Sequence, residues 1–83
     1  MEIRVNAGYL IIEAVRIDTT LEVVMGQNTS DQGTPYVTWL CRNATDYYWG
    51  DYRDGYDECR RRLFERVLDQ LPGGNGGQSN AAE

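Results

Sequence analysis

Residues 36–67, YVTWLCRNATDYYWGDYRDGYDECRRRLFERV, change from strand-like to helix-like periodicity within one continuous segment. Residues 36–42 and 47–52 are rich in aromatic and β-branched side chains, and the turn-like sequence between them predicts a β-hairpin. From Tyr56 onward the apolar residues recur at helical spacing, and Pro72 with the glycines after it ends the pattern. The segment therefore predicts two antiparallel strands followed by an amphipathic helix.

Three further strands are predicted upstream of this segment. Residues 1–6 and 21–26 alternate apolar and polar side chains, which is the pattern of a half-buried strand. Residues 9–17 are also rich in β-forming residues, but their alternation slips near Glu13 and Ala14, which predicts a bulge. The expected fold class is α+β, an antiparallel β-meander of four to five strands with one C-terminal α-helix packed on one face.

The helical periodicity also predicts the side chains that face the sheet. These residues form one apolar stripe, widened by Phe64 and Leu68: Tyr56, Cys59, Leu63, Val67 and Leu71. We expect Trp39 to be the sheet partner of Leu63. We expect Cys41, on an inward strand face, and Cys59, on the helix stripe, to be small apolar core residues, and the sequence leaves open whether they touch. Asp54 is the predicted N-cap of the helix.

The chain of 83 residues is long enough for one small domain, which we place at residues 1–71. Residues 72–83 have no apolar side chain larger than alanine, so we expect a disordered, glycine-rich tail. The longest apolar run is too short to cross a bilayer, and the N-terminus lacks the features of a signal peptide. We therefore expect a cytoplasmic protein with reduced cysteines and no membrane partner.

The composition excludes several kinds of chemistry. The chain has no histidine, which removes Ser-His-Asp and Cys-His catalysis, and no lysine, which removes Schiff-base chemistry. Two thiols without histidine make a poor metal site. A net charge of −5 argues against direct nucleic-acid binding, because phosphate neutralisation dominates that affinity. We expect a protein that binds a partner, with no catalytic residue, metal or cofactor, and not an enzyme.

Residues 46–58, DYYWGDYRDGYDE, contain five aromatic residues, five acids and one arginine. Aromatic rings supply large contact areas at low entropic cost, and nearby acids attract a basic partner. The predicted protein-binding residues are the acids of this segment and its outward rings: Asp46, Tyr48, Asp51, Tyr52, Asp54, Asp57 and Glu58. The competing interpretation is structural, because strand alternation puts Tyr47 and Trp49 on one face, Tyr48 and Tyr52 on the other, and half of the rings in the core.

Within the same segment, Gly50 is expected to mark a bulge or a close backbone approach. The arginines that follow also have two interpretations. A self-paired, solvated helix face would use pairs four residues apart, such as Asp57 with Arg61 and Glu58 with Arg62. Alternatively, a homo-oligomer would bind a small anionic or nucleotide-like ligand by aromatic stacking and through four arginines: Arg53, Arg60, Arg61 and Arg62.

The order of these features resembles a pattern found in small, acidic, uncharacterised proteins of Gram-positive phages and conjugative elements. The resemblance covers residues 36–67 and rests on a Y-V-T-W-x-C strand, an aromatic Y-Y-W-G-x-Y strand and a charged helix. The pattern has histidine and phenylalanine where this chain has Asp51 and Arg53. Mobile elements of this kind carry anti-CRISPR and other anti-defence proteins. The resemblance thus implies an inhibitor of a host defence enzyme, and the acidic aromatic segment is expected to bind a basic surface of that enzyme. A homodimer is also an expected partner state.

Overall fold

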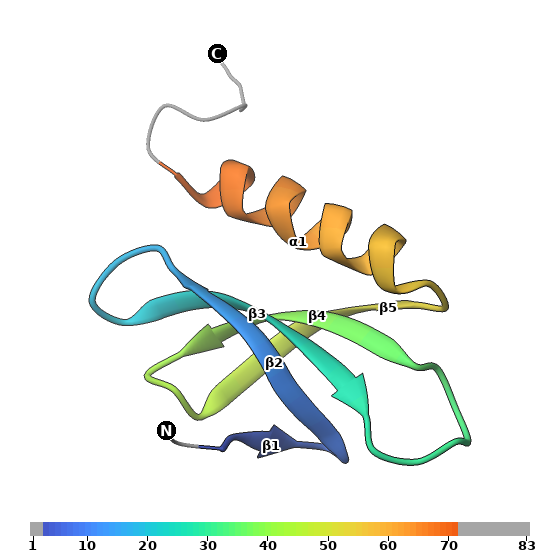
Figure 1. Ribbon diagram of the computed structural model, residues 1–83. Helices are drawn as coiled ribbons and strands as arrows, with labels where there is room; N and C mark the ends of the chain where they lie inside the picture. Colours follow the sequence, from blue (N-terminus) through green and yellow to red (C-terminus); the bar gives the residue numbers. More distant parts are fainter. Residues whose placement is uncertain (1–2, 72–83) are drawn as a thin grey trace.

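Five segments with alternating side chains form one antiparallel sheet, and a C-terminal helix lies across one of its faces (Figure 1). The structure is a computed structural model that describes residues 3–71. Its elements are β1 (Val5–Asn6), β2 (Tyr9–Arg16), β3 (Leu21–Asn28), β4 (Tyr36–Arg42), β5 (Asp46–Arg53) and α1 (Tyr56–Gln70). Each strand pairs with the next in sequence, so the predicted α+β meander is confirmed. The tail predicted at residues 72–83 lies outside the described residues.

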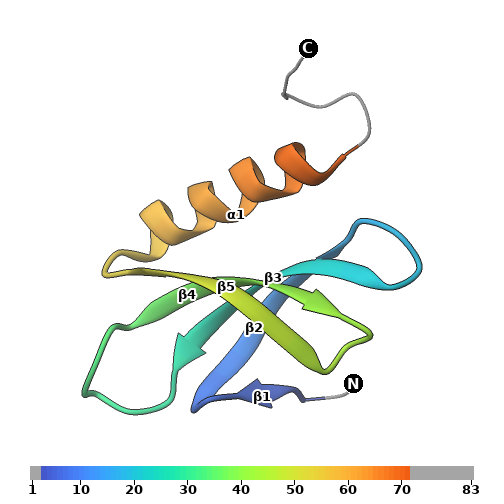
Figure 2. The same ribbon diagram turned by 180° about the vertical axis from the view of Figure 1, so that it is seen from behind.

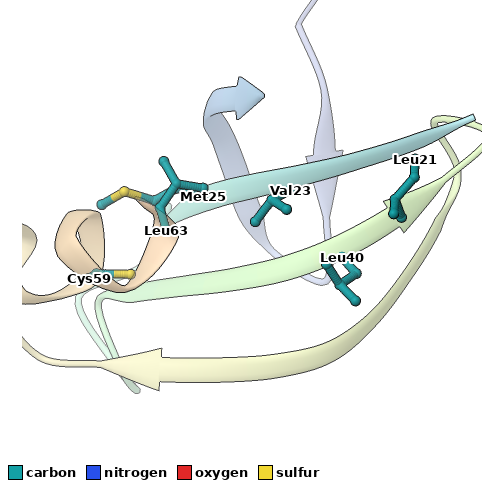
Figure 3. Packing of buried hydrophobic residues seen from close by; sticks show 6 residues of the cluster. All are labelled: Leu21, Val23, Met25, Leu40, Cys59 and Leu63. Atoms are coloured by element: carbon teal, nitrogen blue, oxygen red, sulfur yellow. The ribbon is translucent and has the colours of Figure 1, made fainter. Parts of the chain in front are cut away.

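The face of the sheet beneath α1 carries an aliphatic core. Its buried members come from β3, β4 and α1, and Figure 3 shows them: Leu21, Val23, Met25, Leu40, Cys59 and Leu63. Leu63 has no exposed surface, and it is the largest apolar side chain that α1 buries completely. Burial of such side chains against the sheet is what stabilises a helix of this length, since isolated helices of about 15 residues are marginal in water.

The opposite face of the sheet carries a second, aromatic core. Its buried members are Tyr9, Val24, Val37, Trp39 and Cys41. The ring centroids of Tyr9 on β2 and Tyr52 on β5 lie 6.0 Å apart. In a flat sheet these two strands would be separated by about 14 Å, because adjacent strands are spaced about 4.8 Å apart. The sheet is therefore strongly coiled, with the face away from α1 on its concave side, where β1 also lies (Figure 2).

The predicted contact between Trp39 and Leu63 is wrong, and the contact between Cys41 and Cys59 that the sequence left open does not form. Trp39 and Cys41 belong to the concave core, whereas Leu63 and Cys59 belong to the core beneath α1. Trp39 is therefore not the partner of Leu63, and the two cysteines lie on opposite faces of the sheet. In β4 both sides of the strand are apolar, so alternation alone cannot say which side faces the helix.

Two bulges interrupt the alternation. The β2–β3 register shifts between Ile11 and Glu13, next to the bulge predicted at Glu13. The β4–β5 register shifts between Thr38 and Leu40, which lie opposite Asp51 and Tyr48 respectively. The second shift confirms a bulge at Gly50.

The bulge in β5 reverses the expected order of its rings. Tyr47 and Tyr52 both contact Trp39 on the concave side, whereas Tyr48 packs against the core beneath α1. The expectation that Tyr48 and Tyr52 share a face is therefore wrong, because an extra residue between them changes the parity.

The helix begins as predicted at Tyr56, but its N-cap is Gly55, which makes no side-chain capping bond. The prediction of Asp54 as the N-cap is therefore wrong by one residue. The predicted stripe holds only in the middle of α1, because its ends Tyr56 and Leu71 are 43% and 39% exposed and the widening residues Phe64 and Leu68 are 45% and 49% exposed. The third residue that α1 buries is Arg66, which was not predicted to face the sheet.

We expect Leu63→Ala to lower the free energy of unfolding by about 2–5 kcal/mol, because it removes a completely buried side chain and leaves a cavity beneath α1. Leu68→Ala is the matched control on the same helix. Leu68 is 49% exposed, so its replacement should change stability by less than about 1 kcal/mol. Chemical denaturation followed by circular dichroism measures both values. Equal losses for the two variants would contradict the position assigned to the helix.

Candidate functional site

The largest exposed ring on the edge strand β5 is Trp49, which is 71% exposed. Its backbone has φ 56°, a left-handed conformation that bulky side chains rarely adopt. Its ring packs edge-to-face on that of Tyr48, with centroids 5.3 Å apart. A strained conformation that exposes a tryptophan favours a binding role, because such strain gathers at functional sites. Trp49 was not among the residues predicted for the site. The bulge predicted at Gly50 could have indicated that the neighbouring Trp49 leaves the regular strand and is exposed.

Gly50 holds this bulge open above Trp39. A Cβ atom at Gly50 would lie 2.9 Å from Nε1 of Trp39 and 2.8 Å from the ring of Tyr52. Trp39 is 4% exposed and lies between the rings of Tyr9 and Tyr47, so its indole has little room to move. The close approach predicted at Gly50 is therefore confirmed.

We expect Gly50→Ala to destabilise the fold by about 1–3 kcal/mol, because the added methyl group overlaps a buried indole. Trp49→Asn at the adjacent position is the control, since asparagine tolerates a positive φ and adds no atom against Trp39. Thermal unfolding compares the two. An unchanged melting temperature for Gly50→Ala would mean that the bulge relaxes freely.

A partly buried ion pair fixes the concave side of the site. Arg4 donates to Glu22 at 3.0 and 3.2 Å and to the hydroxyl of Tyr47 at 3.2 Å. These contacts raise the pKa of Arg4, with the hydrogen bond to Glu22 as the main cause. Arg4 thus connects the N-terminal segment to β3 and β5 across the concave face. Tyr52, 51% exposed, is the outermost ring of that face to contact Trp39.

The predicted acidic residues fall into two groups. Asp46, Asp54 and Asp57 are exposed and form no ion pair within residues 3–71. Asp51 and Glu58 are instead both bound to Arg53, at 2.6 and 2.9 Å. The free acidic surface is thus smaller than residues 46–58 predict.

The surface that remains available on β5 has two exposed rings and two free acids. One acid is the first residue of the strand, and the other follows its last residue. We call it the β5 surface, and it consists of Asp46, Trp49, Tyr52 and Asp54. Tyr48 is half-buried in the core beneath α1, so it supports Trp49 instead of being freely exposed.

Asp51 connects β5 to the helix. Its carboxylate accepts a hydrogen bond from Nε of Arg53 at 2.6 Å and one from Nε of Arg62 at 2.7 Å. The hydrogen bond from Arg53 is the main cause that lowers the pKa of Asp51 to about 2, against the opposing effect of burial. Asp51 is therefore a structural anion that orients α1 on the sheet.

The arginine run points in three directions. Arg60 binds Glu13 on β2 at 2.9 Å and lies over the ring of Phe64. Arg62 binds Asp51 on β5. Arg61 is exposed and has no ion pair within residues 3–71. The predicted pairs of Asp57 with Arg61 and Glu58 with Arg62 do not form in this part of the chain. Within residues 3–71 the run has one pair inside the helix, Arg62 with Glu65 at 3.3 Å. Arg60 and Arg62 are also bound to acids on the sheet, so the three arginines neither converge on one site within the chain nor form a continuous self-paired face.

Within residues 3–71 no group of three or more potential metal ligands comes together. In the same range, α1 is not long and apolar enough to cross a membrane. Comparison of the chain with protein-family models, curated proteins and solved structures finds no match.

We expect Asp51 to contribute about 1–2 kcal/mol of stability that is lost on acidification. Its pKa is about 2 in the folded protein and about 4 in the unfolded chain, so its contribution is complete above about pH 4 and disappears as the pH falls to 2. Asp51→Asn should reduce the loss of stability between pH 4 and 2, whereas Asp46→Asn should leave the acid-unfolding curve unchanged. Denaturant unfolding at a series of pH values tests this. Equal curves for Asp51→Asn and the parent protein would contradict it.

Proposed function

We propose that the chain is a non-catalytic protein-binding module that acts through the β5 surface. Trp49 carries this proposal, because a 71% exposed tryptophan held at a positive φ costs stability and exposes apolar area to water. Tryptophan is also the side chain most enriched among residues that dominate binding energies. The neighbouring ring of Tyr48 limits its freedom, so little side-chain entropy would be lost on binding.

The free acids at and beyond the ends of β5 favour a partner with a basic surface. Asp46 and Asp54 are exposed, and Asp57 extends the acidic character onto the first turn of α1. Unpaired acids on the same edge of the sheet as an aromatic anchor attract cations and repel phosphate. This arrangement fits the inhibitor of a nucleic-acid-directed host defence enzyme that the mobile-element resemblance implies. Such an inhibitor would act in the cytoplasm by occupying a basic channel.

The edge position of β5 gives the partner direct access to this surface. In the described part of the chain, β5 pairs on one side only, with β4, and the other side has no strand neighbour. Bulges and unusual backbone conformations are common on edge strands because they discourage unspecific strand pairing. Recognition through the exposed ring and acids is therefore favoured over the addition of a further strand.

We expect Trp49→Asn to weaken partner binding by about 30-fold or more, since one aromatic anchor commonly contributes at least 2 kcal/mol. The melting temperature should stay within a few degrees of the parent, because Trp49 is not part of either core. The experiment immobilises the full chain, captures proteins from a Gram-positive bacterial lysate and compares the captured set with that of Trp49→Asn. For each protein that the parent captures and Trp49→Asn does not, the affinity for both chains is then measured directly.

Two matched variants separate the acidic surface from the arginines. Exchange of both Asp46 and Asp54 for lysine should also abolish binding, and added salt should weaken the parent complex. Exchange of Arg61 for glutamate should leave the affinity nearly unchanged, because this side chain lies away from the β5 surface on α1. Binding that survives Trp49→Asn and the lysine exchange but fails with Arg61→Glu would overturn the proposal.

A further inference from the structure

Arg66 is a buried cation without a carboxylate partner. It is 8% exposed and lies between α1 and the sheet, yet no acid within residues 3–71 approaches it closely enough to form an ion pair. Arginine is rarely buried to this degree unless it is paired, because removing a charge from water costs several kcal/mol. A buried guanidinium in a chain of net charge −5 therefore needs a physical reason.

The hydrogen bonds of Arg66 leave one edge of its guanidinium free. Nη1 donates to the carbonyl oxygen of Thr38 at 3.0 Å and to its hydroxyl at 2.9 Å, which together use both hydrogens of this nitrogen. Nε and Nη2 have no hydrogen-bond partner within residues 3–71. These two nitrogens form the edge with which arginine grips the two oxygens of a carboxylate or phosphate side by side. Because Thr38 is completely buried, it holds Nη1 in place and so fixes the direction of the free edge.

The local field favours an anion at this edge. Burial lowers the pKa of Arg66, and repulsion from the charge of Arg62 lowers it further, whereas Asp51 and Asp69 act in the opposite direction. Asp51 is already shared between Arg53 and Arg62, so its charge is largely neutralised. An additional anion beside Arg66 would relieve the repulsion between two arginines one helical turn apart.

We propose that the free edge of Arg66 is a binding subsite for an oxyanion, a carboxylate or a phosphate, at the boundary of α1 with β4 and β5. Thr38 is the last residue of β4 before the register shift that exposes Trp49, so the subsite adjoins the bulge on the helix side. This position is independent of the acidic residues of the β5 surface. A free phosphate and the carboxylate of a docked partner present the same pair of oxygens to the guanidinium.

The test measures thermal unfolding of the full chain at constant ionic strength while sodium phosphate or sodium acetate replaces sodium chloride. We expect the melting temperature to rise with the logarithm of the anion concentration once that exceeds the dissociation constant, by roughly 6–11 °C at a tenfold excess. Arg66→Met removes the fork and should abolish this rise, leaving only the general effect of each salt. Arg61→Met, at an exposed arginine, should keep it.

The two anions distinguish the source of the ligand. A rise that depends on Arg66 and occurs with phosphate alone assigns a phosphate ligand, and such a rise with acetate as well assigns a carboxylate, as a partner side chain would supply. Because Arg66→Met could fail to fold, the Nε–H signal of Arg66 in nitrogen-15 NMR spectra of the parent protein provides a second measurement. The chemical shift of this signal should change as the anion is added. It should reach a plateau in the range of anion concentration in which the melting temperature begins to rise. No saturable change of that signal with either anion, or equal melting shifts in Arg66→Met, would overturn the subsite.

Discussion

The space around the indole of Trp39 determines the shape of the sheet. Trp39 lies on the concave side of β4, the strand between β3 and β5, in edge-to-face contact with rings from β2 and β5. It fits there because both flanking strands have a glycine beside it. A Cβ at Gly26 would lie 3.4 Å from the indole and 3.0 Å from Cβ of Tyr9. A Cβ at Gly50 would lie 2.9 Å from the indole. Coiling around this ring lets a single sheet bury its second face without a second layer. The same packing produces the bulge that exposes Trp49.

Electrostatic contacts set the orientation of the helix over this sheet. Arg60 connects α1 to β2 through Glu13, and Arg62 connects it to β5 through Asp51, so the helix is held from both sides. Pairs of this exposure each contribute little stability. Their effect is on position, because together they fix the rotation of α1 about its axis and thereby bring Arg66 onto Thr38. The acids used in this way are no longer available to a partner, which confines the free acidic surface to Asp46, Asp54 and Asp57.

The order of the elements could be predicted from the sequence, whereas the faces of the strands could not. Alternation and helical spacing are local properties, and they indicated all five strands and the start of α1 at Tyr56. The two faces of β4 are both apolar, so only the tertiary structure decides that Trp39 and Cys41 lie away from the helix. In β5 the bulge adds one residue and reverses the parity after Trp49. The arginine partners were missed because spacing along a helix says nothing of competing acids on strands, such as Glu13 and Asp51.

The position of α1 after all five strands affects how the domain folds. The sheet side beneath α1 exposes apolar residues of β3 and β4 until the helix that covers them has docked. The concave side does not need the helix, because all its rings come from the strands. An intermediate with α1 undocked would thus have a finished aromatic core and an open aliphatic one. Uncovered apolar sheets of this kind associate readily, so slow docking of the helix would favour aggregation of the folding chain or its capture by chaperones.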